Sequence, residues 1–276
     1  NGQASSHNYL NRNKQSVALD LKNPDSIALI LSKISSYDIV IEQFRPGVMQ
    51  RLGLDYPRLA AINPRLIYCS VSGYGQTGSH KSRAGHDINY LALSGIAGHS
   101  GRRHSGPPPM GIQIADVAGG SLHALIGILS AVIERSQSGL GQHIDISMLE
   151  SLVEWMNYPL YYAIDGASPP PRAGASHATI YPYGPFPAGD GKNVMLGLQN
   201  EREWTAFCDK VLLRPELAQE ARFASNSRRS AARDELRQII VDAFASLSAA
   251  QVLERLDLAQ IANAQLNTMH DVWEHP

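Results

Sequence analysis

The stretch that decides the fold reads LIYCSVSGYGQTG and runs from Leu66 to Gly78. Its first seven residues, which end at Ser72, are mostly apolar, β-branched or aromatic, and this composition predicts a buried strand. The glycine-rich segment that follows, residues 73–78, predicts a turn that ends the strand. Other strands and helices are found by working outward from this point.

Strands and helices alternate along the first half of the chain. Upstream, residues 17–21 (VALDL) and 38–42 (DIVIE) are typical of strands, and the two prolines Pro24 and Pro46 stand where helices can begin. Downstream, a short helix over residues 86–95 and a long helix over 117–135 precede a strand over 144–148. The long helix is apolar nearly all round, so we expect it to be buried. The alternation predicts an α/β fold whose parallel sheet is covered by helices on both faces.

The second half of the chain has a different composition. Seven prolines lie between residues 159 and 187, which marks a crossing between two domains. A strand over 192–198 and helices around 201–212, 230–246 and 248–256 follow. The chain opens on polar residues without an initiator Met and stops in a polar stretch, so we expect it to be a piece of a longer protein.

Composition excludes several classes of function. The formal net charge is −1, which does not favour a nucleic-acid partner, and no apolar run approaches the length that we expect of a membrane span. Cys69 and Cys208 are the only cysteines, so there is no disulfide framework and a reducing cytoplasm is expected. His99 and His104 have two arginines between them, which would repel a cation, so no metal is expected.

Asp116 is the residue most suited to chemistry, because it stands at the start of the long apolar helix. An Asp at this position is commonly an N-cap that accepts bonds from free backbone N–H groups. The same geometry would also hold a carboxylate rigidly for nucleophilic attack on an activated acyl group. Gly119 and Gly120 in the first turn would let a substrate approach the backbone, whose N–H groups could stabilise an oxyanion. The pair His86-Asp87 is a weaker second candidate.

Several segments, in the same order along the chain, resemble the class III CoA-transferase family, the CaiB/BaiF type. The segments are Leu10–Lys22 (LNRNKQSVALDLK), Glu42–Gly53 (EQFRPGVMQRLG), Asn63–Tyr68 with Ser72–Gly75, Asp116–Gly120, and Gly139–Met148. Together they span nearly the whole chain.

The resemblance implies a fold and an assembly. It implies a Rossmann-like large domain over residues 1–165, a linker over 166–180, a smaller α+β domain over 181–256 and a truncated return segment over 257–276. It also implies an interlocked homodimer, and that the family's first βα unit and its closing segment are missing from this chain.

The resemblance also implies a mechanism with coenzyme A thioesters as substrates. The family's catalytic aspartate corresponds to Asp116, which would form an aspartyl anhydride and then an aspartyl-CoA thioester. The coenzyme A contacts correspond to residues along the first third of the chain: Leu10, Lys14, Gln43, Phe44, Arg45, Arg51 and Asp87. Gln43 departs from the Asn that the family usually has there.

Three functions remain open at this point. The segment Gly85–Tyr90 with His86 resembles α-methylacyl-CoA racemases, in which His86 and Asp116 would be paired acid and base groups. Residues 183–187 and 197–208 resemble instead the transferases that move CoA from a donor such as succinyl-CoA to a C4–C5 dicarboxylic acid, such as itaconate or mesaconate. In that case His86 would bind the thioester carbonyl or the acceptor, and Arg102 and Arg103 could meet a distal carboxylate. The third alternative is a non-catalytic CoA-binding module.

Overall fold

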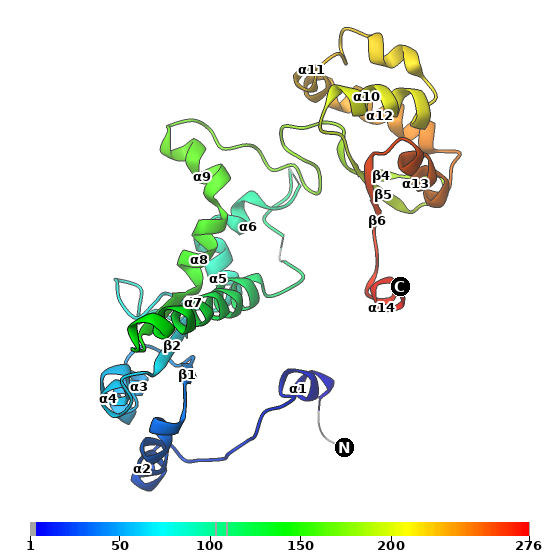
Figure 1. Ribbon diagram of the computed structural model, residues 1–276. Coiled ribbons are helices and arrows are strands. Elements are labelled where there is room, and N and C mark those ends of the chain that lie inside the picture. The colour runs from blue at the N-terminus through cyan, green and yellow to red at the C-terminus, as the bar shows by residue number, and fades with distance from the viewer. Residues whose placement is uncertain (1–3, 103, 109, 276) are drawn as a thin grey trace. The chain divides into compact units, whose positions relative to one another are not determined.

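The computed structural model describes residues 4–102, 104–108 and 110–275, and these form two compact units (Figure 1). Unit 1 consists of residues 1–95 and 110–156, and unit 2 consists of residues 96–109 and 157–276. The finer division into a linker over 166–180, a small domain over 181–256 and a return segment over 257–276 stays a prediction.

Unit 1 is built on a three-stranded parallel sheet in the order β1-β2-β3. Its strands are β1 (Ile39–Glu42), β2 (Ile67–Ser72) and β3 (His143–Ser147). Cys69 in the central strand is opposite Ile41 on one side and Ile144 on the other. The sequence prediction of a parallel sheet in an α/β fold is thus confirmed. The helical elements of unit 1 are α1 (Ser5–Leu10), α2 (Pro24–Lys33), η1 (Ile34–Ser36), α3 (Val48–Leu52), α4 (Tyr56–Ile62), α5 (Asp87–Leu93), η2 (Ala115–Leu122), α7 (His123–Ser138) and α8 (Met148–Trp155).

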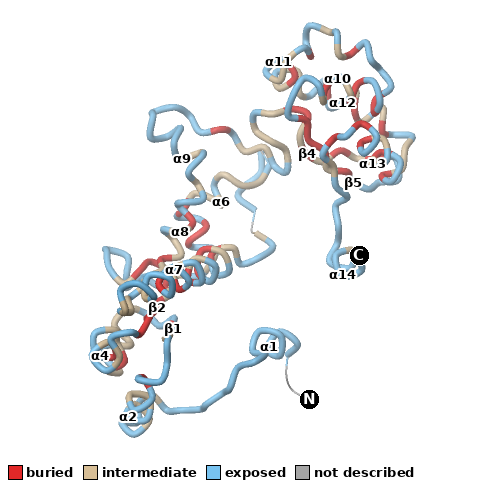
Figure 2. The backbone as a smooth tube through the Cα atoms, viewed as in Figure 1, coloured by how far each residue is buried: buried red, intermediate tan, exposed pale blue. Residues whose placement is uncertain are grey.

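Helices cover both faces of this sheet because successive strand residues point in opposite directions. Tyr68 packs on one face in a cluster with residues of α2, α3 and α4. Its neighbours Ile67 and Cys69 pack on the other face against Ala124, Ile128 and Ala131 of α7. Burial in unit 1 is accordingly concentrated around β2 and the helices that contact it (Figure 2).

The prediction of a strand over residues 17–21 is wrong. Residues 14–20 form no helix and no strand, and Val17 is 73% exposed. An apolar run forms a strand only where another strand accepts its hydrogen bonds, and none of the described residues pairs with this segment.

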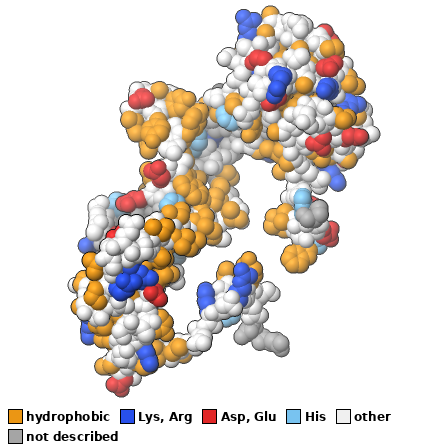
Figure 3. Space-filling model, in the orientation of Figure 1, with side chains coloured by type: hydrophobic (Ala, Val, Ile, Leu, Met, Phe, Trp, Pro, Cys, Tyr) orange, Lys and Arg blue, Asp and Glu red, His pale blue; other side chains and the backbone are white. Residues whose placement is uncertain are grey.

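The long apolar helix is present, but the expectation that it is buried all round is wrong. The run Ala115–Ser138 is continuous helix, and only one side of α7 meets the sheet. The opposite side exposes a row of large apolar side chains: Val117, Leu122, Leu125, Ile126, Leu129, Val132 and Ile133. Figure 3 shows hydrophobic side chains gathered over this helix. The run is long and apolar enough to cross a membrane by length and composition, which corrects the expectation that no apolar run approaches that length.

Unit 2 has an antiparallel sheet of three strands in the order β4-β5-β6. The strands are β4 (Tyr183–Pro187), β5 (Asn193–Gly197) and β6 (Ala262–Gln265). Its helical elements are α6 (Ile96–His99), α9 (Asn157–Ile164), α10 (Glu201–Ala206), η3 (Phe207–Val211), η4 (Pro215–Gln219), α11 (Asn226–Ala231), α12 (Arg233–Phe244), α13 (Ala249–Leu258) and α14 (Met269–Glu274). The predicted strand over 192–198 corresponds to β5, and the predicted helices correspond to α10 with η3, to α12 and to α13.

The core of unit 2 contains one fully buried arginine. Arg229 is 2% exposed and donates to the carbonyl oxygens of Tyr181 (3.1 Å) and Phe223 (3.0 Å). Its guanidinium also bonds Glu201 (2.5 Å) and lies 5.1 Å from the centre of the Trp204 ring. A buried charge is tolerated only with such partners, so Arg229 ties α11 to α10 and to the segment before β4.

Candidate active site

A cleft of about 540 Å³ lies at the carboxyl edge of the parallel sheet in unit 1. Each of the three strands ends here, and residues just beyond each end line the cleft: Gln43, Phe44, Arg45 and Pro46 after β1, Gly73 and Tyr74 after β2, and Met148 after β3. His86 and Asp87 at the start of α5, and Asp116 in η2, line the cleft as well. In open α/β sheets this edge is where ligands bind.

Asp116 is the second residue of η2, and its backbone is held by another carboxylate. Oδ1 of Asp87 accepts hydrogen bonds from the N–H groups of Ala115 (2.7 Å) and Asp116 (3.2 Å). The N-cap interpretation of Asp116 is therefore wrong, because Asp87 accepts the bonds from the free N–H groups at this helix start. The Asp116 side chain itself is exposed to solvent and lines the cleft.

The surroundings of Asp116 make its carboxylate more basic than usual. Desolvation raises the pKa of Asp116, the negative charge of Asp87 raises it further, and His86 lowers it. A carboxylate with a raised pKa is a stronger nucleophile, and perturbed groups in a cleft are typical of functional sites. Arg45, Lys81 and Arg83 also line the cleft, so an anionic substrate meets positive charge there.

Two tyrosines form one wall of the cleft. The rings of Tyr74 and Tyr90, 7% and 5% exposed, pack edge to face with centroids 5.2 Å apart. Tyr90 lies against Gly73 and Gly85, where a Cβ atom at either position would overlap its ring. Burial, Tyr74 and Asp116 raise the pKa of Tyr90, so its hydroxyl stays protonated near neutral pH. The hydroxyls of Ser72 and Tyr74 are buried and have no hydrogen-bond partner in the described part of the chain.

The structure brings six of the sequence-predicted site residues together. Gln43, Phe44, Arg45, His86, Asp87 and Asp116 all line the cleft. Three others do not line it: Leu10 and Lys14 lie in the exposed N-terminal segment, and Arg51 is exposed on α3. Their contacts with coenzyme A stay a prediction, and Arg103 lies outside the described residues.

The two glycines after Asp116 pack against protein. A Cβ at Gly119 would lie 3.2 Å from the carbonyl oxygen of Met148, and a Cβ at Gly120 would lie 3.4 Å from Val71. Both glycines therefore let η2 lie close to α8 and β2. The stabilisation of an oxyanion by this turn stays a prediction.

Sequence reasoning missed the residues that complete the cleft: Ser72, Tyr74, Lys81, Arg83, Tyr90 and Gln113. The one local signal for the tyrosine wall was the pair Gly73 and Gly85, which leaves room for a ring. The described residues contain no group of three or more His, Cys, Asp or Glu side chains placed to hold a metal ion.

Fold and site together define the class: an α/β protein in which a carboxylate with a fixed backbone lines a cleft at the carboxyl edge of a parallel sheet. The chain belongs to CoA-transferase family III, whose family model matches residues 1–276, and it is an enzyme of that class. It is 32% identical over 274 residues to the succinate–glutarate CoA-transferase of Agrobacterium fabrum, covering 99% of this chain and 68% of the relative.

A second relative and a solved structure agree with this assignment. The chain is 32% identical over 272 residues to the succinyl-CoA:mesaconate CoA-transferase of Haloarcula hispanica, covering 97% of this chain and 67% of the relative. The crystal structure of a CaiB/BaiF family protein from Brucella suis matches with a TM-score of 0.83 and 33% identity, over 96% of this chain and 70% of that one. The chain thus spans about two thirds of the length of these proteins.

Proposed function

We propose that this chain transfers coenzyme A from an acyl-CoA donor such as succinyl-CoA to a C4–C5 dicarboxylic acid, for which mesaconate and itaconate are the first candidates. The observation that carries the proposal is the Asp116 carboxyl, which is exposed in the cleft while its backbone is fixed by Asp87. Relatives that act on succinate, glutarate and mesaconate support the size and charge of the acceptor.

In the proposed reaction the Asp116 carboxylate attacks the thioester carbonyl of the donor. The C–S bond breaks, coenzyme A leaves as a thiolate, and Asp116 is joined to the acyl group as a mixed anhydride. The thiolate then attacks the aspartyl carbonyl, which releases the donor carboxylate and leaves an aspartyl-CoA thioester. The acceptor carboxylate next attacks the aspartyl-CoA thioester, which releases the thiolate and forms a second anhydride. The thiolate then attacks the acceptor carbonyl of this anhydride, which gives the acceptor-CoA thioester and frees the Asp116 carboxylate. One thioester is exchanged for another, so the protein mainly orients the partners and excludes water.

The charges of the cleft suit these substrates. Arg45, Lys81 and Arg83 are placed to meet the phosphates of coenzyme A or a substrate carboxylate, because such groups bind cationic side chains well. A neighbouring cavity of about 350 Å³ shares Pro46 and Lys81 with the cleft, which gives a long substrate room to extend along β1 and β2.

The racemase alternative rests on His86, which lines the same cleft as Asp116. Both relatives described above are transferases, which favours transfer over proton exchange. The non-catalytic module gives no reason for Asp87 to fix the backbone of an exposed Asp116, so we set it aside.

One experiment separates the three functions. The full-length protein is incubated with succinyl-CoA and a panel of dicarboxylic acids, and new thioesters are separated by chromatography. A transferase produces a thioester only when an acceptor is added, and hydroxylamine traps its acyl-enzyme. Asp116→Asn should abolish the product. If a chiral 2-methylacyl-CoA takes up solvent deuterium at its α-carbon without an acceptor, the enzyme is a racemase.

We also propose that the protein is a homodimer and works in the cytoplasm. The exposed apolar row on η2 and α7 supports association, since monomers rarely leave so large an apolar surface uncovered. The buried, unbonded thiols of Cys69 and Cys208 support a reducing compartment. Sedimentation of wild type and of Leu129→Lys tests the dimer: the variant should sediment as a monomer.

A further inference from the structure

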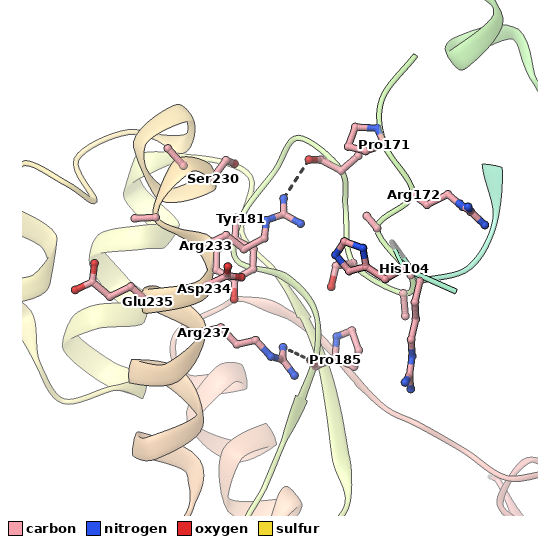
Figure 4. Close-up of a pocket in the computed structure, with 18 residues that line it drawn as sticks. His104, Pro171, Arg172, Tyr181, Pro185, Ser230, Arg233, Asp234, Glu235 and Arg237 are labelled. Carbon is pink, nitrogen blue, oxygen red and sulfur yellow. Dashed lines mark hydrogen bonds between the residues drawn. The ribbon is translucent and has the colours of Figure 1, made fainter. Parts of the chain in front are cut away.

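A cavity of about 1030 Å³ in unit 2 is lined by four arginines, three of which are labelled in Figure 4. We call it the arginine pocket and define it by Arg102, Arg172, Arg233 and Arg237, together with Tyr181. All of these residues belong to unit 2, whereas Asp116 and the cleft around it belong to unit 1. The proposed transfer reaction assigns no role to this pocket.

The walls of the arginine pocket are fixed by backbone-directed hydrogen bonds. Arg233 donates to the carbonyl oxygens of His177 and Ala178, both at 3.1 Å, and Arg237 donates to that of Pro185 at 3.2 Å. Arg172 donates to the carbonyl oxygen of Ser105 at 2.8 Å, which holds the loop of Arg102 against the segment after α9. These bonds occupy some of the five donors of each guanidinium, so N–H groups remain for a ligand.

The pocket is positively charged. None of its four arginines takes part in the five ion pairs of the described residues. Two carboxylates also line the pocket, and one of them, Glu235, is paired with Arg222. Asp234 is left to offset four guanidinium groups, so the net charge favours an anion.

Tyr181 is a further feature of the pocket wall. It is 2% exposed, and the side chain of Arg237 approaches its hydroxyl, although no bond of good geometry joins the two. Burial raises the pKa of Tyr181 to about 12, although Arg237 and Arg233 lower it, so the hydroxyl remains a donor at neutral pH. Because buried hydroxyls in folded proteins are normally well bonded, this one is suited to donate to an acceptor on a ligand.

We propose that the arginine pocket binds a small molecule that carries at least two carboxylate or phosphate groups. Arg233 and Arg237 are four residues apart on α12 and therefore lie on one face of that helix, where they serve one anionic group. Arg172 and Arg102 lie on the loops across the cavity and serve another. The volume is at the upper end of the range for ligand pockets, which is more than one phosphate or carboxylate group fills.

Isothermal titration calorimetry of the full chain at constant ionic strength tests the proposal. Inorganic pyrophosphate and propane-1,2,3-tricarboxylate are the two probes, so that a phosphate ligand is distinguished from a carboxylate ligand. We expect one saturable site for at least one probe. Arg237→Gln should raise its Kd about tenfold, as the loss of one charge-assisted hydrogen bond does. Tyr181→Phe should raise the Kd several-fold, and Arg172→Gln tests the opposite wall.

Arg214→Gln is the matched control, because Arg214 pairs with Glu216 outside the pocket. Its Kd should equal that of the wild type, and so should that of Asp116→Asn, because Asp116 belongs to unit 1 and does not line the pocket. The proposal is overturned if neither probe gives saturable binding, if Arg237→Gln and Arg172→Gln bind as well as the wild type, or if Arg214→Gln weakens binding equally. Since CoA transfer is not measured, these results are independent of the proposed function.

Discussion

Asp87 determines both the position and the basicity of the proposed nucleophile, so Asp87→Asn should change transfer activity in two separate ways. Its Oδ1 accepts from the N–H groups of Ala115 at 2.7 Å and Asp116 at 3.2 Å. A hydrogen bond to a charged group contributes about 1.5–3 kcal/mol. The neutral amide retains an acceptor but loses the charge, so we expect kcat to fall by roughly tenfold, which corresponds to about 1.4 kcal/mol.

The second effect of Asp87→Asn concerns pH. The charge of Asp87 raises the pKa of Asp116, so its removal lowers that pKa. Only the ionised form of Asp116 is a nucleophile, and the acidic limb of kcat/KM should therefore move to lower pH. The assay follows succinyl-CoA consumption with a saturating acceptor from acid to neutral pH.

Asp165→Asn is the control for this experiment, because it neutralises an exposed carboxylate in unit 2. Its kcat and its acidic limb should be those of the wild type. Asp87→Ala, which removes the acceptor as well, should lower kcat further than Asp87→Asn. A limb that stays in place or moves to higher pH in Asp87→Asn would refute the assignment of Asp116 as the group that must ionise.

Three further changes test the site and the two cores. Asp116→Asn should melt at a higher temperature than wild type at pH 7. The pKa of Asp116 in the folded protein lies above the usual 3.8, so wild type loses stability as the pH rises through that pKa and the carboxyl ionises. The difference in melting temperature should vanish in acid, where Asp116 is protonated. Gly141→Ala should lower the free energy of unfolding by about 2 kcal/mol, measured in urea, because its Cβ would overlap the backbone carbonyl of Leu66. Arg229→Ala should cost about 2–5 kcal/mol in the same assay, since a large buried side chain is removed and the carbonyl groups of Tyr181 and Phe223 lose their donor.

The parallel sheet could be predicted because its signal is local. The runs rich in Ile and Val over residues 38–42, 66–72 and 144–148 lie where β1, β2 and β3 are found, and glycine directly follows β2. The segment over residues 17–21 has a similar local pattern but no neighbouring strand among the described residues, and partner strands cannot be read from composition. The helix Ala115–Ser138 shows the same limit, because its apolar sequence does not tell which side faces the sheet.

The candidate site could be predicted only in part, because local patterns can be read from the sequence and contacts between distant segments cannot. Asp116 was found because a carboxylate before an apolar helix is a local feature. Its capping partner Asp87 is 29 residues away and reaches it only after α5 has packed near η2. The tyrosine wall likewise depends on the approach of two loops, which places Gly73 and Gly85 against one ring.

The structure of the helix Ala115–Ser138 links the proposed chemistry to the proposed dimer. Its first turn carries Asp116 into the cleft, its inner side packs on β2 and β3, and its outer side is the exposed apolar row. A rigid helix fixed at the start by Asp87 and along its length by the sheet cannot shift at one side without moving the other. We therefore expect a partner on the apolar row to add to the contacts that hold the proposed nucleophile, so a chain that fails to associate should lose transfer activity before it loses its fold.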